Sequence, residues 1–459
     1  MARKKTAFRL MEYVASAYKF QFIIVVLTIV ISAMAGMAGP LFLLFLIDDY
    51  IIPLIGSQNP DFSGLAKVVL SFASVYSVGV ICTYIYNRLM VNIGQGVLKR
   101  IRDDMFNHMQ KLPIRYFDTH SHGEVMSLYT NDTDTLRQMI TQSIPQTLSA
   151  FVTIVTIFIL MVGLNLPLAF LTVLIVILML TVIKKIGGKS GAYFVEQQKE
   201  ISKVSGFIEE MMVGQKVIKV FCHEEKSKQD FDILNERLFK SATAANKYAN
   251  ILMPIMGNIG NLHYVLTVFI GALLVVTGIS TMTLGTIATF LQLTRSFTQP
   301  FSMIAQQMNF IVMALAGAER IFNMLDEEIE VDNGYVTLVN AKRDENGELV
   351  ECKEFTQTWA WKHPHRDGTT TYTELKGDVR FFDMTFAYNP DKIILHNLNL
   401  YAKPGQKIAF VGSTGAGKTT ITNLINRFYD VADGKIRYDG ININKIKKAD
   451  LRRSLGVVL

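Results

Sequence analysis

The chain has 459 residues, of which 50% are hydrophobic and 19% are charged, and its mean hydropathy is +0.27. These values are unusual for a soluble globular protein and favour a membrane protein. Cys82, Cys222 and Cys352 are far apart and odd in number, which argues against a disulfide framework or a cysteine metal site. The net charge of +7 leaves two kinds of partner to weigh, anionic lipid and nucleic acid.

Six apolar segments have the length and composition expected for crossing a hydrocarbon core about 30 Å thick. Their bounds are 20–47, 65–86, 143–164, 168–183, 251–278 and 284–308, and the fourth is the shortest. A single segment of this kind could be a buried helix of a soluble protein. Six in succession, joined by loops with ordered charges, predict six membrane-spanning helices.

The loops alternate in charge. Those after the first, third and fifth segments (48–64, 165–167 and 279–283) contain no Lys or Arg, whereas basic residues gather at the N-terminus and in the connections 87–142 and 184–250. The positive-inside rule therefore places both termini in the cytoplasm. Basic segments beside the membrane meet anionic lipid, so we expect membrane lipid and no nucleic acid as a partner. A cleavable signal peptide is not expected, because the first apolar segment is too long.

The two long connections are polar but keep helical apolar spacing, as in Val97, Ile101 and Met105. We expect the membrane helices to continue well into the cytoplasm, with one interruption near 113–123 and another near Gly214. Extensions of this kind suit mechanical contact with a soluble domain. The alternative is a pair of exposed helical hairpins.

The sixth segment carries a polar stripe. Its residues recur at steps of three and four, so they share one face of a helix: Gln292, Arg295, Gln299, Ser302, Gln306 and Asn309. The fifth segment adds Asn258, Asn261 and His263. Arg295 lies about eleven residues into its segment, where a charge is costly and marks a functional site by default. The stripe is expected to line a cavity. The alternative is a seam of interhelical hydrogen bonds in which Arg295 pairs with an acid.

The segment 332–376 is polar and rich in turn residues, and it holds both tryptophans, Trp359 and Trp361. We expect a small surface module or hairpin here. A metal site at His363 and His365 is the alternative.

A complete phosphate-binding loop follows. Its residues are Gly412, Ser413, Thr414, Gly415, Ala416, Gly417, Lys418 and Thr419. The apolar run 407–411 before it predicts a buried parallel strand, and 420–425 predicts the start of a helix. The glycines let backbone N–H groups face one anion, Lys418 is expected to reach the β- and γ-phosphates, and Thr419 is expected to bind Mg²⁺. A Gly-rich turn that matches by chance is the alternative, and the order of strand, loop and helix disfavours it.

Six spans, two cytoplasmic helical extensions and a C-terminal phosphate-binding loop together resemble one half of an ABC exporter of the type IV, multidrug- and lipid-exporter-like group. Three segments carry the resemblance in detail: 116–132, with Tyr116-Phe117-Asp118 and Thr130-Asn131-Asp132; 214–221; and 379–388. The first two look like the family's intracellular coupling segments. The third looks like the strand that enters the nucleotide domain.

The resemblance covers nearly the whole chain, apart from 332–376, and implies its organisation. An all-α transmembrane domain occupies 1–330, a polar linker 331–376, and an incomplete α/β nucleotide-binding domain 377–459. The six helices are expected at about 20–47, 65–112, 123–164, 168–221, 225–278 and 284–327. Tyr388 takes the position of the aromatic residue that stacks on adenine, and Thr420 helps to hold the α-phosphate. A tyrosine of the structural core is the alternative for Tyr388.

The resemblance also implies a function. The expected activity is ATP-driven export of a small molecule, lipid or peptide across a bacterial cytoplasmic membrane, by alternating access, with ATP and Mg²⁺ as cofactors. The long linker resembles subunits of heterodimeric exporters, so a second, unlike half-transporter is the favoured partner, and Arg295 would favour anionic or amphiphilic cargo. The family's catalytic glutamate, signature loop and switch histidine are expected beyond Leu459, so these 459 residues alone are not expected to hydrolyse ATP. The alternatives are an ATP-gated, channel-like protein and an inactive truncated product.

Overall fold

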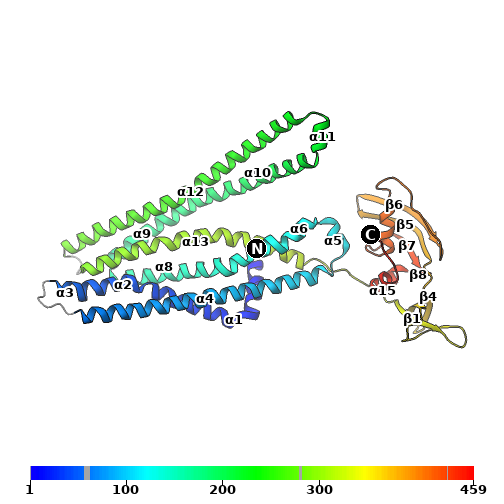
Figure 1. Cartoon of the computed structure of the whole chain (residues 1–459), viewed down its shortest axis with the longest axis horizontal. Coiled ribbons are helices and arrows are strands. Elements are labelled where there is room, and N and C mark those ends of the chain that lie inside the picture. The colour runs from blue at the N-terminus through cyan, green and yellow to red at the C-terminus, as the bar shows by residue number, and fades with distance from the viewer. Residues whose placement is uncertain (1, 56–61, 279–281, 432, 459) are drawn as a thin grey trace. The chain divides into compact units, whose positions relative to one another are not determined.

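The computed structural model describes residues 2–55, 62–278, 282–431 and 433–458 (Figure 1). The chain divides into two compact units. Unit 1 comprises Met1–Ile101 and Thr130–Ile321, and unit 2 comprises Arg102–Tyr129 and Phe322–Leu459.

Unit 1 is helical. Its helices with their bounds are α1 (Ala2–Gly36), α2 (Ala38–Phe45), α3 (Ile52–Leu54), α4 (Ser63–Met109, which extends into unit 2), α7 (Thr133–Gln138), α8 (Ile144–Leu164), α9 (Leu166–Val182), α10 (Gly188–Val213), α11 (Gln215–Val220), α12 (Glu224–Val276) and α13 (Leu284–Leu325, whose last turn belongs to unit 2). Short π-helical turns join several of them, including η1 (Leu46–Ile51), η3 (Met139–Ser143) and η4 (Ile183–Gly187).

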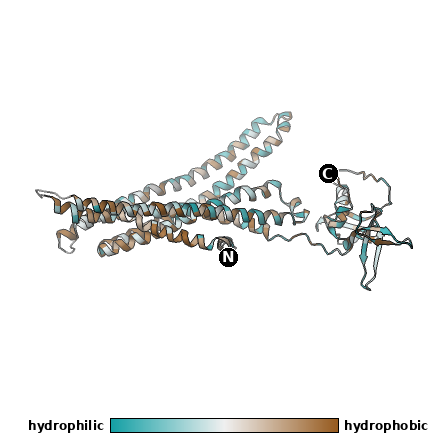
Figure 2. Ribbon diagram, turned by 60° about the horizontal axis from the view of Figure 1, so that its bottom comes forward, coloured by the Kyte–Doolittle hydropathy of each residue, from teal (hydrophilic) through white to brown (hydrophobic). Residues whose placement is uncertain are grey.

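Six helical segments are long and apolar enough to cross a membrane, which confirms the expected spans. They run over Thr6–Leu54, Ser63–Met109, His122–Leu164, Leu166–Val213, Glu224–Val276 and Leu284–Leu325. Helix α4 has 47 residues and α12 has 53. At 1.5 Å per residue these helices are about 70–80 Å long, more than twice a hydrocarbon core. The apolar residues therefore occupy only part of each helix, as the hydropathy colouring in Figure 2 shows.

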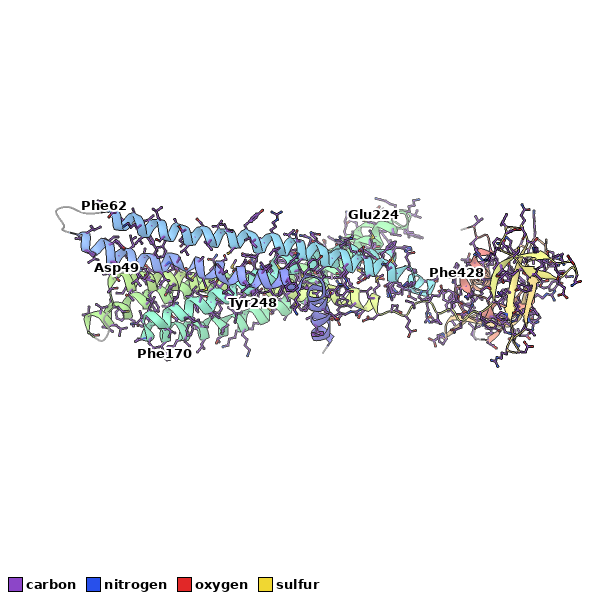
Figure 3. The ribbon with its side chains drawn as sticks, turned by 90° about the horizontal axis from the view of Figure 1, so that it is seen from below. Asp49, Phe62, Phe170, Glu224, Tyr248 and Phe428 are labelled. Atoms are coloured by element: carbon purple, nitrogen blue, oxygen red, sulfur yellow. The ribbon has the colours of Figure 1, made fainter. Side chains whose placement is uncertain are left out.

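The expected interruptions are present. Helix α4 ends at Met109, and α10 is separated from α11 by Gly214, whose backbone is not helical. Between α11 and α12 the chain turns at Cys222, which has a φ of +54°. Helices α10 and α12 pack along one another, and the rings of Tyr193 and Tyr248 stack with centroids 5.3 Å apart (Tyr248 is labelled in Figure 3).

An ion pair with a buried carboxylate and an exposed guanidinium joins α13 to the start of the third span. The Asp132 side chain is 4% exposed and accepts hydrogen bonds from Nε and Nη2 of Arg320. A Cβ at Gly317 would lie 3.1 Å from Oδ1 of Asp132, so the glycine lets α13 approach this carboxylate closely. The pair lies in the 116–132 segment that the sequence singles out.

Unit 2 contains two four-stranded antiparallel sheets and several short helices. The first sheet has the order β2-β1-β3-β4, and the second has the order β6-β5-β7-β8. The strands are β1 (Thr337–Arg343), β2 (Leu349–Glu351), β3 (Trp359–Pro364), β4 (Thr370–Glu374), β5 (Val379–Asn389), β6 (Lys392–Ala402), β7 (Asp433–Tyr438) and β8 (Ile441–Asn442). The helices are α5 (Ile114–Thr119), α6 (His122–Ser127), α14 (Lys418–Ile425) and α15 (Lys448–Arg453).

The segment 332–376 is therefore a sheet that shares a core with the second sheet. Trp361 is fully buried in that core, and its Nε1 donates a 3.0 Å hydrogen bond to Asp439. Val336, just before β1, pairs with Ile446. The first sheet is thus held in place by its packing on the second sheet.

The predicted buried strand at 407–411 is not formed. These residues have no regular secondary structure, and Val411 is 95% exposed. A parallel strand needs at least one parallel neighbour to take its ladder bonds, whereas the strand ladders of the described residues are all antiparallel. An apolar run without paired neighbours has nothing to hold it extended and buried.

Candidate functional site

The phosphate-binding loop ends at the N-terminus of α14. Gly417 is the N-cap, with a φ of +86°, and Gly415 has a φ of +87°. Both values lie in the left-handed region that favours glycine. A Cβ on Gly417 would also lie 2.6 Å from Cδ2 of Leu395, on β6. The sequence therefore bends here, and a helix with unpaired N–H groups begins directly behind the bend.

Lys418 lies across this loop. Its Nζ donates 2.8 Å hydrogen bonds to the carbonyl oxygens of Gly412 and Ser413. The ammonium group is thus held at the mouth of the loop, beside the N-terminus of α14, and Thr419 lies in the first turn of that helix. A glycine-shaped loop, a helix N-terminus, a lysine and a hydroxyl form a donor set that fits a triphosphate with Mg²⁺.

The other residues of the phosphate-binding loop differ in their exposure. Gly412, Ser413, Thr414, Gly415 and Ala416 are exposed, whereas Thr420, the next helical residue after Thr419, is buried. The exposed part of the loop can reach a ligand without rearrangement of the core.

Tyr388, at the end of β5, lies next to this helix. Its hydroxyl is 3.2 Å from Oγ1 of Thr420 and accepts a 3.3 Å hydrogen bond from Nδ2 of Asn423. Its ring meets those of Phe386 and Tyr429 edge to face, at 5.0 and 4.8 Å. The structure thus brings Tyr388 and Thr420 together. It also gives Tyr388 a packing role, which is the alternative that the sequence left open.

Tyr429 joins this cluster to α5. Its hydroxyl donates a hydrogen bond to Asp118, which lies in the Tyr116-Phe117-Asp118 motif. Burial, together with the bond to the Asp118 carboxylate, raises the pKa of Tyr429 above its ordinary value. The phenol therefore stays protonated and keeps donating throughout the physiological pH range.

A cluster of charged side chains connects α15 with the residues that follow α14. Arg452 forms a bidentate pair with Glu330, at 2.6 and 2.9 Å, and Lys448 lies 3.3 Å from the same carboxylate. Arg427, whose side chain is 4% exposed, and Lys448 both bind Asp430. Burial alone would raise the pKa of Glu330, but the bonds and charges of Arg452 and Lys448 outweigh it and lower the pKa.

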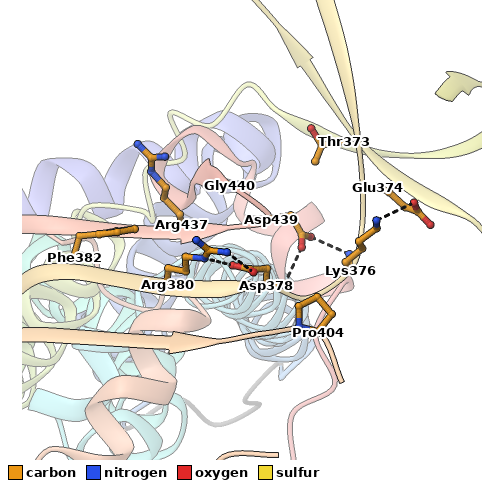
Figure 4. Close-up of a pocket in the computed structure, with 10 residues that line it drawn as sticks. All are labelled: Thr373, Glu374, Lys376, Asp378, Arg380, Phe382, Pro404, Arg437, Asp439 and Gly440. Carbon is orange, nitrogen blue, oxygen red and sulfur yellow. Dashed lines mark hydrogen bonds and ion pairs between the residues drawn. The ribbon is translucent and has the colours of Figure 1, made fainter. Parts of the chain in front are cut away.

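A cavity of about 370 Å³ lies between the two sheets of unit 2, and Figure 4 shows the residues that line it. Asp439 accepts hydrogen bonds there from the backbone N–H groups of Lys376 and Asp378, and Asp378 pairs with Arg380. The Arg437 guanidinium lies 5.6 Å from the centroid of the Phe382 ring. The acids and bases named here bind one another or backbone N–H groups, and Asp439 links the second sheet to the segment that connects the two sheets.

The polar stripe of the sixth span is only partly a cavity lining. Its members lie along one face of α13, as the spacing predicts, and Arg295 is exposed there. The guanidinium of Arg295 lies 4.7 Å from the ring centroid of Tyr264, on α12. Arg295 is therefore held by an aromatic ring, and among the described residues it has no acidic partner within ion-pair distance. Gln292, Gln299, Ser302 and Gln306 lie on the same helix, and the side chain of Asn309 lies outside the described residues.

The polar residues of the fifth span divide into two groups. Asn258 and Asn261 are exposed on α12, and Nδ2 of Asn258 donates to the carbonyl of Pro254. His263 is fully buried, and its Nε2 lies 3.1 Å from Oγ1 of Thr172 on α9. His263 thus belongs to an interhelical hydrogen bond, whereas the two asparagines face outward with the stripe.

A larger cavity, of about 560 Å³, escaped the sequence prediction. It lies between α4, η3, α8 and α13, and of the predicted cavity residues it includes only Gln299. Its other polar walls include Asn87 and Gln146. The signal was present as amides at the ends of the second and third apolar segments, but no helical periodicity links residues on different helices.

The alternative of a metal site near the tryptophans finds no support. The rings of His363 and His365 lie 4.3 Å apart, and His365 is hydrogen-bonded to Thr371. Within the described parts of the chain, no group of three or more His, Cys, Asp or Glu residues could hold a metal ion.

Six membrane-crossing helices followed by a phosphate-binding loop at a helix N-terminus define a multi-pass membrane protein with a nucleotide site. Comparison with family models supports this assignment. Residues 22–301 match the family model of the ABC transporter transmembrane region, and residues 395–459 match the model described as ABC transporter. The chain belongs to the ABC transporter family.

Similar proteins come from several bacteria. The chain is 34% identical over 456 residues to the uncharacterized ABC transporter ATP-binding protein YfiC of Bacillus subtilis, covering 99% of this chain and 69% of that protein. It is 31% identical over 406 residues to a fatty acid ABC transporter ATP-binding/permease protein of Mycobacterium tuberculosis, covering 88% and 59%. It is 27% identical over 394 residues to an ATP-dependent lipid A-core flippase of Syntrophus aciditrophicus, covering 86% and 60%. The chain thus spans about three fifths to two thirds of these relatives.

Proposed function

We propose that the protein is one half of a dimeric ABC exporter that moves an amphiphilic small molecule or lipid across the bacterial cytoplasmic membrane at the expense of ATP. One observation carries the proposal. The same chain holds six membrane-crossing helices and, at the start of α14, a phosphate-binding loop with Lys418 at its mouth. The relatives described as fatty acid transporter and lipid A-core flippase support a lipid-like cargo.

ATP with Mg²⁺ is the proposed ligand of the loop. Lys418 would contact the β- and γ-phosphates, Thr419 would bind the metal ion, and Thr420 would lie near the α-phosphate. Tyr388 is proposed to present a ring to the base, next to the same helix. Hydrolysis of ATP is proposed for the transporter assembled with its partner.

A second half-transporter is the proposed partner. The turn around α11 carries apolar side chains that are largely exposed in unit 1, among them Val213 at 85%, Val220 at 77% and Phe221 at 67%. Exposed apolar groups at the end of a long polar helical pair favour burial against another protein surface. The amide stripe on α13 supports a second contact with the partner or with cargo. An unlike subunit is favoured, because of the linker module.

The proposed orientation has both termini in the cytoplasm. Its support is the alternation of Lys and Arg between the loops, which follows the positive-inside rule. This orientation places the phosphate-binding loop on the side of the membrane where ATP is available.

Uphill transport is the decisive measurement. The full-length protein with its partner would be reconstituted in vesicles, and accumulation of a fluorescent lipid or dye would be followed with ATP and with a non-hydrolysable analogue. Accumulation against a gradient that needs hydrolysis supports the exporter. Flux that only runs downhill and opens with the analogue would favour an ATP-gated channel. Absence of both, with intact ATP binding, would favour an inactive product.

Arg295 is proposed to attract amphiphilic cargo to the exposed face of α13. Its guanidinium packs on the ring of Tyr264. The test is the cargo preference of Arg295→Ala and Arg295→Lys in the same vesicles. An unchanged preference in Arg295→Ala would remove this role.

A further inference from the structure

The cavity between α4, η3, α8 and α13 is open to its surroundings, and its walls have an unusual composition for a membrane domain. Its polar lining consists of amides and hydroxyls, including those of Asn87, Thr141, Gln142, Gln146, Ser149 and Gln299. None of the described residues that line it is charged. At about 560 Å³ it has the size of a small-molecule site.

A hydrogen-bond chain fixes the orientation of Gln146. Buried Ser143 donates from Oγ to Oε1 of Gln307, at 2.7 Å, and Gln307 donates from Nε2 to Oε1 of Gln146, also at 2.7 Å. This direction leaves the Nε2 group of Gln146 as a donor. The reverse applies to Asn87, whose Nδ2 donates to the carbonyl of Thr83 at 2.8 Å, so that its Oδ1 remains an acceptor. The cavity therefore offers one oriented donor and one oriented acceptor.

The cavity lies where the apolar sequence gives way to polar sequence. Tyr86, in its lining, ends the second apolar segment, and Pro145 lies at the beginning of the third. Met37, Ala150, Pro300 and Met303 supply apolar wall beside the amides. A ligand that fits both surfaces has a polar head and an apolar body.

The absence of charged residues among the described lining residues indicates which kind of polar head the cavity would bind. An ionic head in this cavity would meet no counter-charge on its walls, whereas a head with hydroxyl or amide groups would meet hydrogen-bonding partners there. A head with hydroxyl or amide groups can both accept from Gln146 and donate to Asn87. We propose that this cavity binds the uncharged, hydroxyl- or amide-bearing head of an amphiphile. As a cargo subsite it rests on the proposed export function, whereas binding itself does not.

Photo-cross-linking of lipids tests the inference. The complete chain would be placed in phosphatidylcholine nanodiscs with a monoacylglycerol that carries a diazirine in its tail, or with the fatty acid or the alkylamine that has the same tail. Labelled peptides would be mapped by mass spectrometry. We expect the monoacylglycerol to label peptides of α4, α8 and α13, and to do so at least about tenfold more than either charged probe.

Variants assign the labelling to the two amides. Gln146→Leu and Asn87→Leu each remove one hydrogen bond and are expected to lower labelling about fivefold. Gln229→Leu, the same change at an exposed position of α12 that does not line the cavity, should leave it unchanged. Gln146→Asn keeps the amide and should restore part of the signal if its helix packing is intact, which thermal melting of each variant checks.

Two outcomes would overturn the inference: equal labelling by charged and uncharged probes, or full labelling of Gln146→Leu. Because labelling needs neither ATP nor a partner subunit, its failure is distinguishable from failure of the export proposal. Intact labelling together with absent uphill transport would count against export alone.

Discussion

Lys418 shows how the phosphate-binding loop is prepared for its ligand. Its ammonium is bound to two loop carbonyls, Gly412 and Ser413, so it already lies at the mouth of the loop. Lys418→Ala is expected to weaken binding of a fluorescent ATP analogue at least about tenfold, since it removes a charge-assisted hydrogen bond to phosphate. Lys403→Ala removes an exposed lysine of the same unit and should not weaken binding. Equal affinities for the two variants would contradict the assigned role.

The two left-handed glycines of the loop allow a matched comparison. A Cβ on Gly415 would meet open space, whereas a Cβ on Gly417 would meet Leu395. Gly415→Ala should therefore cost only the backbone strain, about 1–2 kcal/mol. Gly417→Ala adds an overpacking cost of about 1–3 kcal/mol. Chemical unfolding of unit 2 in the detergent-solubilised chain measures the difference, and a larger loss for Gly415→Ala would be inconsistent with this geometry.

The charged cluster around Glu330 predicts a pH dependence. Burial would raise the pKa of Glu330, but Arg452 and Lys448 lower it overall, and the pKa of Asp430 is lowered in the same way by Arg427 and Lys448. A carboxylate whose folded pKa is depressed stabilises the fold above its unfolded pKa of about 4, and this contribution disappears as the pH falls through the folded value.

We therefore expect unit 2 to lose stability from about pH 5 downwards. In Glu330→Gln this loss should be smaller, although stability at pH 7 falls. Unfolding midpoints between about pH 3 and pH 7 measure the effect, with Glu345→Gln, on an exposed turn, as control. A steeper decline in Glu330→Gln would refute the assignment.

At the residue scale, the sequence predicts those sites whose residues lie in one continuous segment of the chain. The phosphate-binding loop is a continuous stretch of chain, so its eight residues follow from the sequence alone. The stripe on α13 is also local, because helical periodicity fixes its face. The cavity around Gln146 and Asn87 depends on the approach of separate helices, and the hydrogen bonds through Gln307 cannot be inferred from spacing. The stacking of Arg295 on Tyr264, rather than pairing with an acid, has the same origin.

The segment 332–376 shows what its turn residues leave open. They predict a small surface module or hairpin, and the segment forms a four-stranded sheet whose Trp361 is completely buried. Alternation within Trp359–Pro364 is consistent with a strand, but the sheet exists because Val336 and Trp361 enter the core of the second sheet. Such tertiary burial is not encoded in any short pattern.

Trp361→Ala should cost about 3–5 kcal/mol, as is typical when a buried aromatic residue is truncated. It also leaves Asp439 without its indole donor. Trp359→Ala, on the same strand but only partly buried, should cost distinctly less. The free energies of unfolding from denaturant titrations decide the order, and equal losses would argue that the module does not share the core.

The segment 407–411 shows that an apolar pattern alone is not sufficient to form a strand. Its composition suits a buried parallel strand, yet Val411 is 95% exposed. Helices form from bonds within their own segment, so the six spans follow from local sequence. A parallel strand takes all of its ladder bonds from other segments, and the described residues supply no parallel ladder.

At the scale of the whole molecule, the two units do not follow the order of the sequence. Helix α4 begins in unit 1 and ends in unit 2. Helix α5, the next helix along the chain, lies in unit 2, where Asp118 accepts a hydrogen bond from Tyr429. A conformational change near the nucleotide loop can therefore reach α5 through Tyr388 and Tyr429, whose rings touch.

Tyr429→Phe removes this hydrogen bond and keeps the ring. Amide hydrogen exchange in residues 114–119 is expected to accelerate about fivefold, the effect of one lost hydrogen bond. Exchange in α14 should change little, because the ring contact with Tyr388 persists. Unchanged exchange in 114–119 would show that the contact does not hold α5.

The position of the two tryptophans has a practical consequence. Both lie on β3, so the six spans contain none. Intrinsic tryptophan fluorescence of this chain reports on a single module, and energy transfer from it to a dye-labelled nucleotide would follow the phosphate-binding loop without any introduced label. Replacing both by phenylalanine would give an optically silent background, in which one tryptophan placed on α13 would report on the membrane domain alone.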